Sequence, residues 1–254
     1  MVDFLKKKTE INTTQIVDKI ESAVYAHIKP YGFNKHGRTL HRFVSGDISQ
    51  IIHFQSGMPA KGMGGLLCVN VGIRIPECSE RVFQAKDEKK KYYHEYECTI
   101  RSRLGIVSGK SETWYDLRKK TTRITDSIIS EIDQYVLPAY EVLNSRETIL
   151  AHRKEYPLLD NMCSLILLEE CMIHGHLGNI EKAKELFELY YNFAVDKYND
   201  ECKNRRKQYL KKGERVVFMG QDITAQKDGY VTLYGASHGH IDYLDELAVS
   251  LGLR

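Results

Sequence analysis

The pattern of hydrophobic and polar positions divides the chain into a first part with strands and a second part dominated by helices. Between residues 14 and 28, apolar side chains recur every three or four positions, which predicts an amphipathic helix. Asn12 or Thr13 can cap its start, and Pro30 with Gly32 can end it. We expect this helix to pack against a core and to carry no chemistry.

After this helix the spacing falls to two residues, which is typical of strands with one buried side. Two such runs, 39–44 and 48–55, flank the turn sequence Ser45-Gly46-Asp47 and predict an antiparallel hairpin. The second run is apolar on both sides, so we expect it to be central in the sheet. A third run, 67–75, carries large apolar residues on one side and small or polar residues on the other, as expected where another group approaches closely.

The segments between and after these runs predict connections rather than sites. Residues 57–65 are rich in glycine, but a phosphate-binding loop leads into a helix, whereas this segment leads into a strand. We therefore interpret it as a connection between strands. Residues 86–97 mix charges with three tyrosines, and this pattern predicts a solvated connection.

The stretch 98–117 contains the only tryptophan of the chain, Trp114. Its first part alternates like a strand, with Arg101 and Arg103 on the polar side, and a glycine-bearing turn follows. We expect Trp114 to be largely buried with its indole nitrogen hydrogen-bonded, because a lone large aromatic commonly anchors a core.

Helical spacing returns after Thr121. An apolar stripe over 124–136 predicts a helix that ends at Pro138, and a further helix is expected over 139–149 and beyond. Asp160 can cap the helix that follows.

The last part of the chain contains two stretches, 178–190 and 239–247, that resemble the turn and second helix of tetratricopeptide-like hairpins. Between them, 216–219 and 230–234 can pair as a small β-hairpin. The basic segment 203–215 predicts a solvated surface helix whose charges point in several directions. The less favoured alternative is that this segment neutralises nucleic-acid phosphates.

Four segments occur in the order that is usual in one bacterial family. They are Gly32 to Arg42, Ile52-His53-Phe54-Gln55, Val69-Asn70-Val71-Gly72 and Cys98 to Leu117. Over roughly residues 14–140 the chain resembles this family, which is catalogued as domain of unknown function 4304. Trp114-Tyr115 stands where a double tryptophan is usual. The resemblance implies an α+β domain and no established activity.

We therefore expect an α+β protein with two domains. Residues 1–140 should form an N-terminal antiparallel sheet of about four or five strands with flanking helices. Residues 141–254 should form a mostly helical C-terminal half, packed against the first, with room for a small β-hairpin.

Composition narrows the classes of function. The chain has 254 residues, 42% hydrophobic and 28% charged, with a net charge of +3, which is too balanced to indicate a nucleic-acid or membrane partner from bulk charge. The N-terminus lacks the apolar run of a signal peptide, and no stretch is long enough to span a membrane. Six scattered cysteines without a Cys-x-x-Cys pair predict reduced thiols without disulfides, so we expect a cytoplasmic protein.

Motifs for catalysis or cofactors are missing from the sequence. His174-Gly175-His176 and His238-Gly239-His240 could each supply two zinc ligands, but no third ligand can be named, and helix-end histidines explain both pairs. No nucleophile elbow, Walker loop or dinucleotide fingerprint is present. We expect no metal and no cofactor, and we lean against an enzyme.

One set of polar residues from the family-like segments remains as a candidate site. The set is Lys35, Arg38, His41, Arg42, Gln55, Asn70, Arg101 and Arg103, with Trp114 and Tyr115 as contact area. On a shared face they would form a basic concavity for a carboxylate, a phosphate or an acidic protein surface. The alternative is that they bond exposed strand edges and loops.

These features favour a cytosolic binding or interaction module that recognises an acidic protein surface or a small anionic ligand. The rival hypothesis is a hydrolase or nuclease acting on a phosphorylated substrate, with His41 or His53 as acid or base. A toxin-immunity type of inhibitor is a further alternative, and analogy at the family level is its only ground.

Overall fold

The computed structural model describes residues 12–82, 91–111, 113–160, 166–203, 206–218, 221–233 and 238–254. The chain separates into two compact units, Met1–Ile166 and Leu167–Arg254. The sequence predicted a division at residue 140, whereas the contacts of the first unit continue to residue 166. An N-terminal antiparallel sheet with helices and a helical C-terminal half confirm the predicted α+β class. Each unit is described by itself below.

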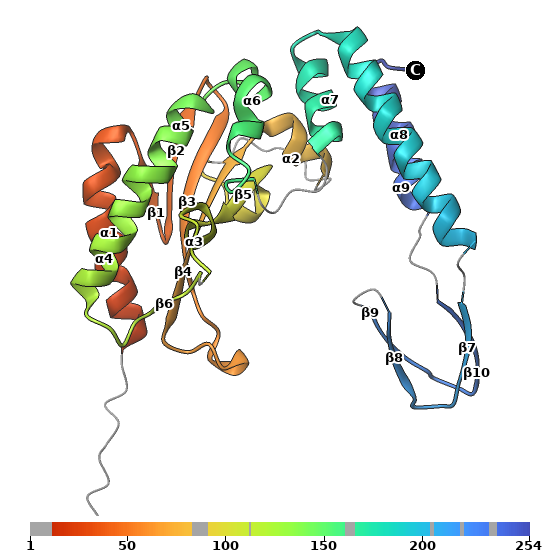
Figure 1. Ribbon diagram of the computed structural model, residues 1–254, viewed down its shortest axis with the longest axis horizontal. Helices are drawn as coiled ribbons and strands as arrows, with labels where there is room; N and C mark the ends of the chain where they lie inside the picture. Colours follow the sequence, from red (N-terminus) through yellow and green to blue (C-terminus); the bar gives the residue numbers. More distant parts are fainter. Residues whose placement is uncertain are drawn as a thin grey trace, which may run out of the picture. The chain divides into compact units, whose positions relative to one another are not determined.

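An antiparallel sheet forms the centre of the first unit (Figure 1). Its strands are β1 (Asn34–His36), β2 (Thr39–Val44), β3 (Ile48–Ser56), β4 (Leu66–Arg74), β5 (Ile100–Arg103) and β6 (Tyr115–Asp116). The first five lie side by side in chain order, and β6 pairs with β4. The sixth strand, which the alternation did not predict, is only two residues long.

The predicted hairpin between β2 and β3 is confirmed. The register runs from the pair Thr39 and His53 to the pair Val44 and Ile48. Strand β3 lies between β2 and β4, and the side chains of Ile51 and Ile52, which point to opposite sides of the sheet, are both fully buried. The apolar character on both sides of this strand therefore correctly indicated a central position.

Helices and short helical turns surround the sheet. The helices are α1 (Thr13–Ile28), α2 (Pro76–Val82), α3 (Leu104–Val107), α4 (Thr121–Glu131), a π-helical segment (Ile132–Val136), α5 (Leu137–Val142) and α6 (Arg146–His152). Helix α1 has the predicted bounds, and Asn12 caps it by accepting a hydrogen bond from the Gln15 N–H at 3.1 Å. In Figure 1, α1, α4 and α5 cover one side of the sheet.

Two predicted helix boundaries are wrong. The helix expected to end at Pro138 continues into α5, because the wider turn of the preceding π-helical segment accommodates a residue that has no N–H to donate. The helix expected over 139–149 ends at Val142, and α6 begins anew after Ser145, whose hydroxyl accepts from the Thr148 N–H. Asp160 was expected to cap the next helix, but residues 161–165 lie outside the described residues, and its carboxylate pairs with Arg153.

The hydroxyl of Tyr140 joins α5 to the two central strands. It lies 2.7 Å from the Ile51 carbonyl and 3.0 Å from the Gly72 carbonyl, and it accepts a hydrogen bond from the Gly72 N–H at 2.9 Å. Tyr140 is fully buried, so these bonds satisfy groups that have no access to water. Burial raises the pKa of this hydroxyl, which therefore stays protonated.

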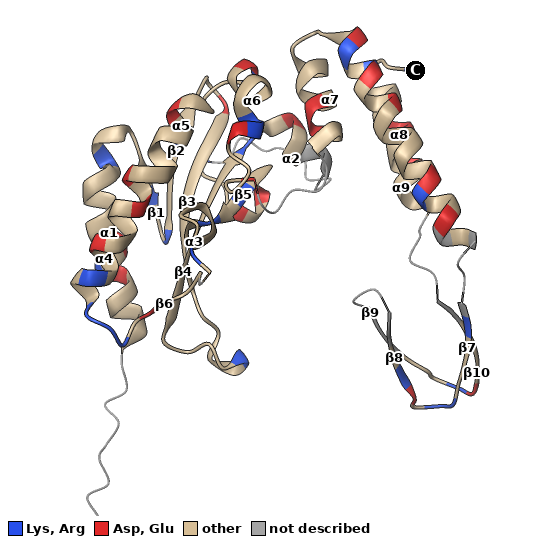
Figure 2. Cartoon of the chain, viewed as in Figure 1, with Lys and Arg blue, Asp and Glu red and all other residues tan. Residues whose placement is uncertain are grey.

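The second unit consists of three helices and a β-ribbon. The helices are α7 (Ile166–His176), α8 (Ile180–Lys203) and α9 (Gly239–Ser250), and the strands are β7 (Arg206–Leu210), β8 (Arg215–Phe218), β9 (Gln221–Thr224) and β10 (Gly229–Leu233). Strand β7 pairs with β10, and β8 pairs with β9. Lysines and arginines lie along β7, the turn after it and β8 (Figure 2).

The ribbon corrects two predictions about this region. The stretches 216–219 and 230–234 do not pair with each other, because each has a different partner strand. The basic segment 203–215 is not a helix, because α8 ends at Lys203 and β7 pairs with the Tyr-Val-Thr-Leu run of β10. Pairing with a run of strand-forming residues overrides the local preference of the charged segment for a helix.

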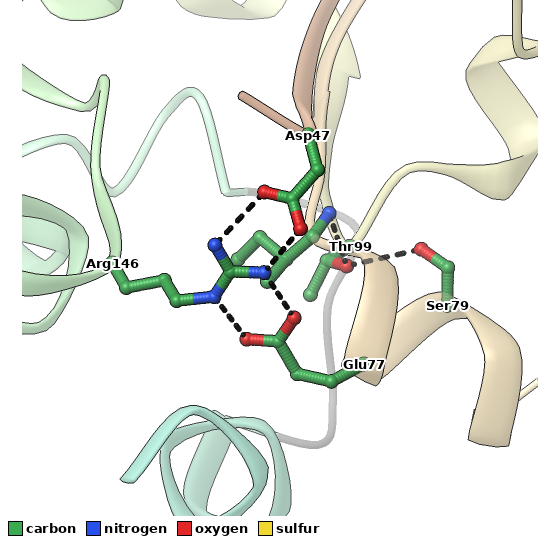
Figure 3. Close-up of polar contacts among 6 residues, drawn as sticks. Asp47, Glu77, Ser79, Thr99 and Arg146 are labelled. Carbon is green, nitrogen blue, oxygen red and sulfur yellow. Dashed lines mark hydrogen bonds and ion pairs between the residues drawn. The ribbon is translucent and has the colours of Figure 1, made fainter. Parts of the chain in front are cut away.

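A buried ion cluster around Arg146 attaches α6 to the sheet (Figure 3). The Arg146 guanidinium pairs in a bidentate manner with Asp47 at 2.9 and 3.0 Å and with Glu77 at 2.8 Å through two nitrogens. Asp47 belongs to the turn between β2 and β3, and Glu77 belongs to α2. This cluster is one reason why the first unit extends past residue 140.

Candidate functional site

The sheet register separates the predicted site residues, since the side chains of directly paired residues point to the same side. Lys35 and Arg42 lie on the side that the helices cover, and Lys35 forms an ion pair with Glu21 of α1 at 2.8 Å. Arg38 lies at the turn between β1 and β2, where it lies 3.8 Å from Asp18 of α1 and donates a hydrogen bond to the end of β3. All three cations therefore have partners within the fold.

Arg42 is held within the fold by several contacts. It donates to Gln50 Oε1 at 2.6 Å and to the Tyr31 carbonyl at 2.8 Å, and it pairs with Glu141 of α5 at 2.6 Å. Its residue is buried. A guanidinium with these partners serves the packing of α5 on the sheet, and it has little capacity left for a ligand.

The remaining polar residues of the predicted site lie on the opposite side of the sheet. They are His41, Gln55, Asn70, Arg101 and Arg103. Asn70 Nδ2 donates to Gln55 Oε1 at 2.9 Å, and Arg101 donates to the Tyr96 carbonyl at 3.4 Å. The structure therefore brings the predicted residues together in two groups on different sides rather than in one.

Arg103, Trp114 and Tyr115 are the predicted residues that lie at a pocket. The guanidinium carbon of Arg103 lies 5.6 Å from the centre of the Trp114 ring, and its Nη1 donates to Thr113 at 3.2 Å. Trp114 is only half-buried, and no hydrogen bond of its indole nitrogen is found within the described residues, so the expected buried anchor is wrong. The short strand β6 holds its neighbour Tyr115 at the end of β4 and leaves the indole at the pocket wall.

The pocket lies between β6 and the first turns of α4 and has a volume of about 440 Å³. Its walls are formed by Lys110, Trp114, Tyr115, Asp116, Lys119, Lys120, Arg123, Ile124 and Ser127. Four of these side chains are cationic and one is anionic. The segment that enters α4 is marked by basic residues in Figure 2.

A dense network around Glu131 forms one side of the pocket. Its carboxylate accepts hydrogen bonds from Ser127 at 2.8 Å, from Ser108 at 2.9 Å and from Tyr115 at 2.9 Å, and Lys110 Nζ lies at 2.5 Å. Burial alone would raise the pKa of Glu131, but these bonds outweigh it and lower the pKa. Burial and the adjacent Glu131 raise the pKa of Tyr115, so its hydroxyl remains a donor.

The Glu131 network leaves the other cations of the pocket available. Lys110 is neutralised by Glu131, and Asp116 is paired with Arg118 at 2.7 Å. No ion pair of Lys120 or Arg123 is found within the part of the chain that the structure describes. The mouth of the pocket therefore has a surplus of positive charge that can attract an anion.

Sequence reasoning missed the basic residues of this pocket. The run Arg118-Lys119-Lys120 comes directly before a predicted helix start, and Arg123 follows one turn later. A basic run at a helix start, four residues after an aromatic pair, was the available signal. Its meaning depended on β6, a two-residue strand that alternation cannot predict.

On the other side of the sheet, aromatic residues of the segment 91–97 cover the histidines of the strands. Tyr92 stacks on His36 with ring centres 3.5 Å apart and lies 6.3 Å from the ring of His41. Tyr93 is buried under the Arg74 guanidinium, whose carbon lies 3.7 Å from the ring centre. The solvated connection predicted for 86–97 is therefore wrong for residues 91–97, and the rest of it lies outside the described residues.

His53 lies in a polar environment at the same side. Its Nδ1 is 3.0 Å from Thr39 Oγ1, and its Nε2 is 4.0 Å from Glu95 Oε2. Burial lowers the pKa of His53, with the charges of His94 and Arg38 adding to the effect, although Glu95 opposes it. Burial and the neighbouring His36 also lower the pKa of His41.

These two histidines predict that the first unit loses stability in acid. Because their folded pKa values lie below the ordinary value of 6.5, the unfolded chain binds more protons, and the free energy of unfolding should fall as the pH drops below 6.5. Urea unfolding followed by Trp114 fluorescence at pH 7.5 and at pH 5.5 measures this difference. The double variant His41→Gln/His53→Gln should show a smaller difference. Greater stability of the wild type at pH 5.5 would contradict the prediction.

The two His-Gly-His pairs have different surroundings. His174 and His176 lie in the last turn of α7, where the helix dipole favours them, and burial lowers the pKa of His174. His238 pairs with Asp242 at 2.8 Å, and His240 Nε2 lies 3.1 Å from the Tyr190 hydroxyl. Among the residues that the structure describes, no group of three or more histidines, cysteines or carboxylates is arranged to hold a metal ion. The absence of a metal stays a prediction.

Comparison with known proteins identifies the first unit at the level of a family. Residues 24–141 match the model of the family described as Domain of unknown function (DUF4304). This confirms the resemblance seen in the four sequence segments. No curated protein and no solved structure matches the chain. None of the helices in the described ranges is long and apolar enough to cross a membrane.

Proposed function

We propose that the first unit is a binding module that takes a small ligand with an anionic group into the pocket between β6 and α4. The observation that carries this proposal is the positive charge of Lys119, Lys120 and Arg123 around a volume of about 440 Å³. Small-molecule sites commonly have this size. Lysine and arginine supply charge-assisted hydrogen bonds to a phosphate or carboxylate, and the half-buried Trp114 ring supplies rigid contact area.

The lining of the pocket favours binding over catalysis. It contains no histidine and no cysteine, which are the residue types most often used as general base or nucleophile at neutral pH. The two carboxylates at hand, Asp116 and Glu131, are both paired with cations. His41 and His53, which the rival hydrolase or nuclease would use, are not among the lining residues.

The site can accept an anionic group from more than one kind of ligand. A protein partner could present a carboxylate or phosphate here, as the immunity-type hypothesis requires, but the pocket volume favours a small molecule as the main occupant. We further place this activity in the cytoplasm. The ground is the set of buried thiols at Cys68, Cys78, Cys98 and Cys171, which suits a reducing compartment.

Trp114 provides a direct test, because the only tryptophan of the chain lines the proposed pocket. Titration with phenyl phosphate should change its fluorescence at saturating concentrations, while the neutral analogue benzyl alcohol should have a much weaker effect. The variant Lys120→Ala/Arg123→Ala should bind phenyl phosphate at least about tenfold more weakly, since hydrogen bonds to charged groups contribute about 1.5–3 kcal/mol each.

The matched control removes two charges elsewhere on the same unit. Lys19 and Lys61 are exposed and lie outside the pocket lining, so Lys19→Ala/Lys61→Ala should bind like wild type. Equal binding of phenyl phosphate and benzyl alcohol, or equal losses in both double variants, would refute the proposal.

A further inference from the structure

The β-ribbon of the second unit is a continuous two-stranded structure from residue 206 to residue 233. Strands β7 and β10 form its base, and β8 and β9 form its far part. Between them, the Gly213 N–H donates to the Ala225 carbonyl at 2.8 Å, and the Ala225 N–H donates to the Glu214 carbonyl at 2.9 Å. The two halves therefore share one hydrogen-bonded backbone.

Two tyrosines lie directly opposite each other on this ribbon. Tyr209 of β7 pairs with Tyr230 of β10, and their ring centres are 5.3 Å apart at an angle of 75°. Both are unusually exposed, at 51% and 74% of their surface. Exposed aromatic pairs leave apolar ring faces in water, which is unfavourable unless a partner covers them.

Cations surround the tyrosine pair. Exposed basic residues of the ribbon are Lys207, Lys211, Lys212, Arg215 and Lys227. Because side chains two apart in a strand point to the same side, Lys207 and Lys211 flank Tyr209 on its own side, each about 7 Å away along the strand. No carboxylate pairs with Lys207 or Lys211 within the described part of the chain.

The nearby acids are engaged by the backbone. Glu214 accepts a hydrogen bond from the Lys211 N–H at 2.8 Å, and Asp228 accepts one from the Lys212 N–H at 2.6 Å. Over residues 206–233 the sequence has six basic residues (Arg206, Lys207, Lys211, Lys212, Arg215, Lys227) and three acidic ones (Glu214, Asp222, Asp228), a difference of +3. The ribbon is therefore as positive as the whole chain, which also has a net charge of +3.

We propose that this ribbon binds single-stranded nucleic acid. Unpaired bases stack on the exposed rings of Tyr209 and Tyr230, and the phosphates on either side of the stacked bases contact Lys207 and Lys211. Cations spaced along a strand beside aromatic rings match the two repeating parts of a single strand, its backbone and its bases. A helix over 203–215 would have spread the same charges around its axis, so the strand geometry changes the conclusion.

The chemistry of the ribbon fits other polyanionic partners less well. A duplex keeps its bases stacked inside, so it offers the tyrosine rings no base faces. A membrane site would present aliphatic side chains to insert, whereas Leu210 is buried and the exposed large apolar residues of the ribbon, among those described, are the two tyrosines. This inference does not depend on the anion pocket of the first unit.

The test measures binding of the full chain to fluorescein-labelled oligo(dT) and oligo(U) by fluorescence anisotropy. Wild type should bind the single strands more tightly than a duplex of equal length. Tyr209→Ser/Tyr230→Ser should weaken binding by about fivefold to a hundredfold, because stacking of one base on an aromatic contributes that range. Tyr209→Phe/Tyr230→Phe should restore it, since phenylalanine keeps the ring.

Charge is tested separately through the salt dependence. Lys207→Gln/Lys211→Gln should weaken binding and reduce the slope of log affinity against log salt by about two, one for each lost phosphate contact. Tyr31→Ser, at an exposed tyrosine of the first unit, and Lys19→Gln/Lys61→Gln serve as controls and should leave binding unchanged. Undetectable binding at low salt, equal affinity for the duplex, tighter binding to phosphatidylserine vesicles, or equal losses in the controls would overturn the inference.

Discussion

Replacing Arg146 by alanine is expected to lower the free energy of unfolding of the first unit by about 3–5 kcal/mol, because it leaves buried carboxylates without their cation. The Arg146 side chain is 9% exposed, and that of Glu77 is 11% exposed. Burial alone would lower the pKa of Arg146, but its hydrogen bonds to Glu77 and Asp47 raise it, so the guanidinium is charged in the folded state. The cluster also joins three separate segments, which lose a common anchor.

The chain contains a matched control for this substitution. Arg118 forms a bidentate pair with Asp116 through Nε and Nη2 at 2.7 and 2.9 Å, but its side chain is 69% exposed. Arg118→Ala should therefore change the free energy of unfolding by no more than about 1 kcal/mol. Urea unfolding monitored by Trp114 fluorescence reports on the first unit in both variants. Equal losses at the two positions would show that burial of the Arg146 cluster adds nothing.

Replacing Gly72 by alanine is the second change with a large expected effect. A Cβ at this position would lie 2.7 Å from Cys98 Cβ, 2.8 Å from Cys98 Sγ and 3.0 Å from the Ile100 carbonyl oxygen. Cys98 is buried beside Ile51 and Tyr93, so neither it nor the neighbouring strand can yield without disturbing the core. Forcing an extra methyl into such a site costs about 1–3 kcal/mol. The hydrogen bonds of Tyr140 to Gly72 would be displaced as well.

Gly64→Ala provides the comparison for Gly72→Ala. At Gly64 a Cβ would meet Pro59 at 3.6 Å, an ordinary contact distance, in the exposed loop before β4. The free energy of unfolding should then change little, because most surface substitutions stay within about 0.5 kcal/mol. If Gly72→Ala proved as harmless as Gly64→Ala, the close approach of Cys98 would not constrain β4.

The periodicity of the sequence predicted the core of the first unit well. The bounds of α1, the hairpin of β2 and β3 and the central place of β3 all followed from which neighbouring positions are apolar. The small and polar side of the 67–75 run also indicated a close neighbour, which the structure identifies as Cys98 beside Gly72. These features are local, because alternation over a few residues determines which side of a strand or helix can be buried.

Local pattern failed where a distant partner determines the structure. Pro138 predicts a helix end, but the π-helical segment before it and packing on the sheet allow the helix to continue. The basic segment 203–215 predicts a helix, but the strand β10 pairs with part of it. In both places a tertiary contact outweighs a preference of less than about 1 kcal/mol per residue for ordinary residues.

The candidate site shows the same division. Sequence by itself determined an α+β protein whose first part resembles an uncharacterised family, and it singled out Arg103, Trp114 and Tyr115. Only the tertiary structure decided that Lys35, Arg38 and Arg42 have partners within the fold, while Lys119, Lys120 and Arg123 share a pocket with Trp114. The physical reason is that this pocket exists through the pairing of β6 with β4, residues about fifty positions apart, and no spacing within either segment encodes that pairing.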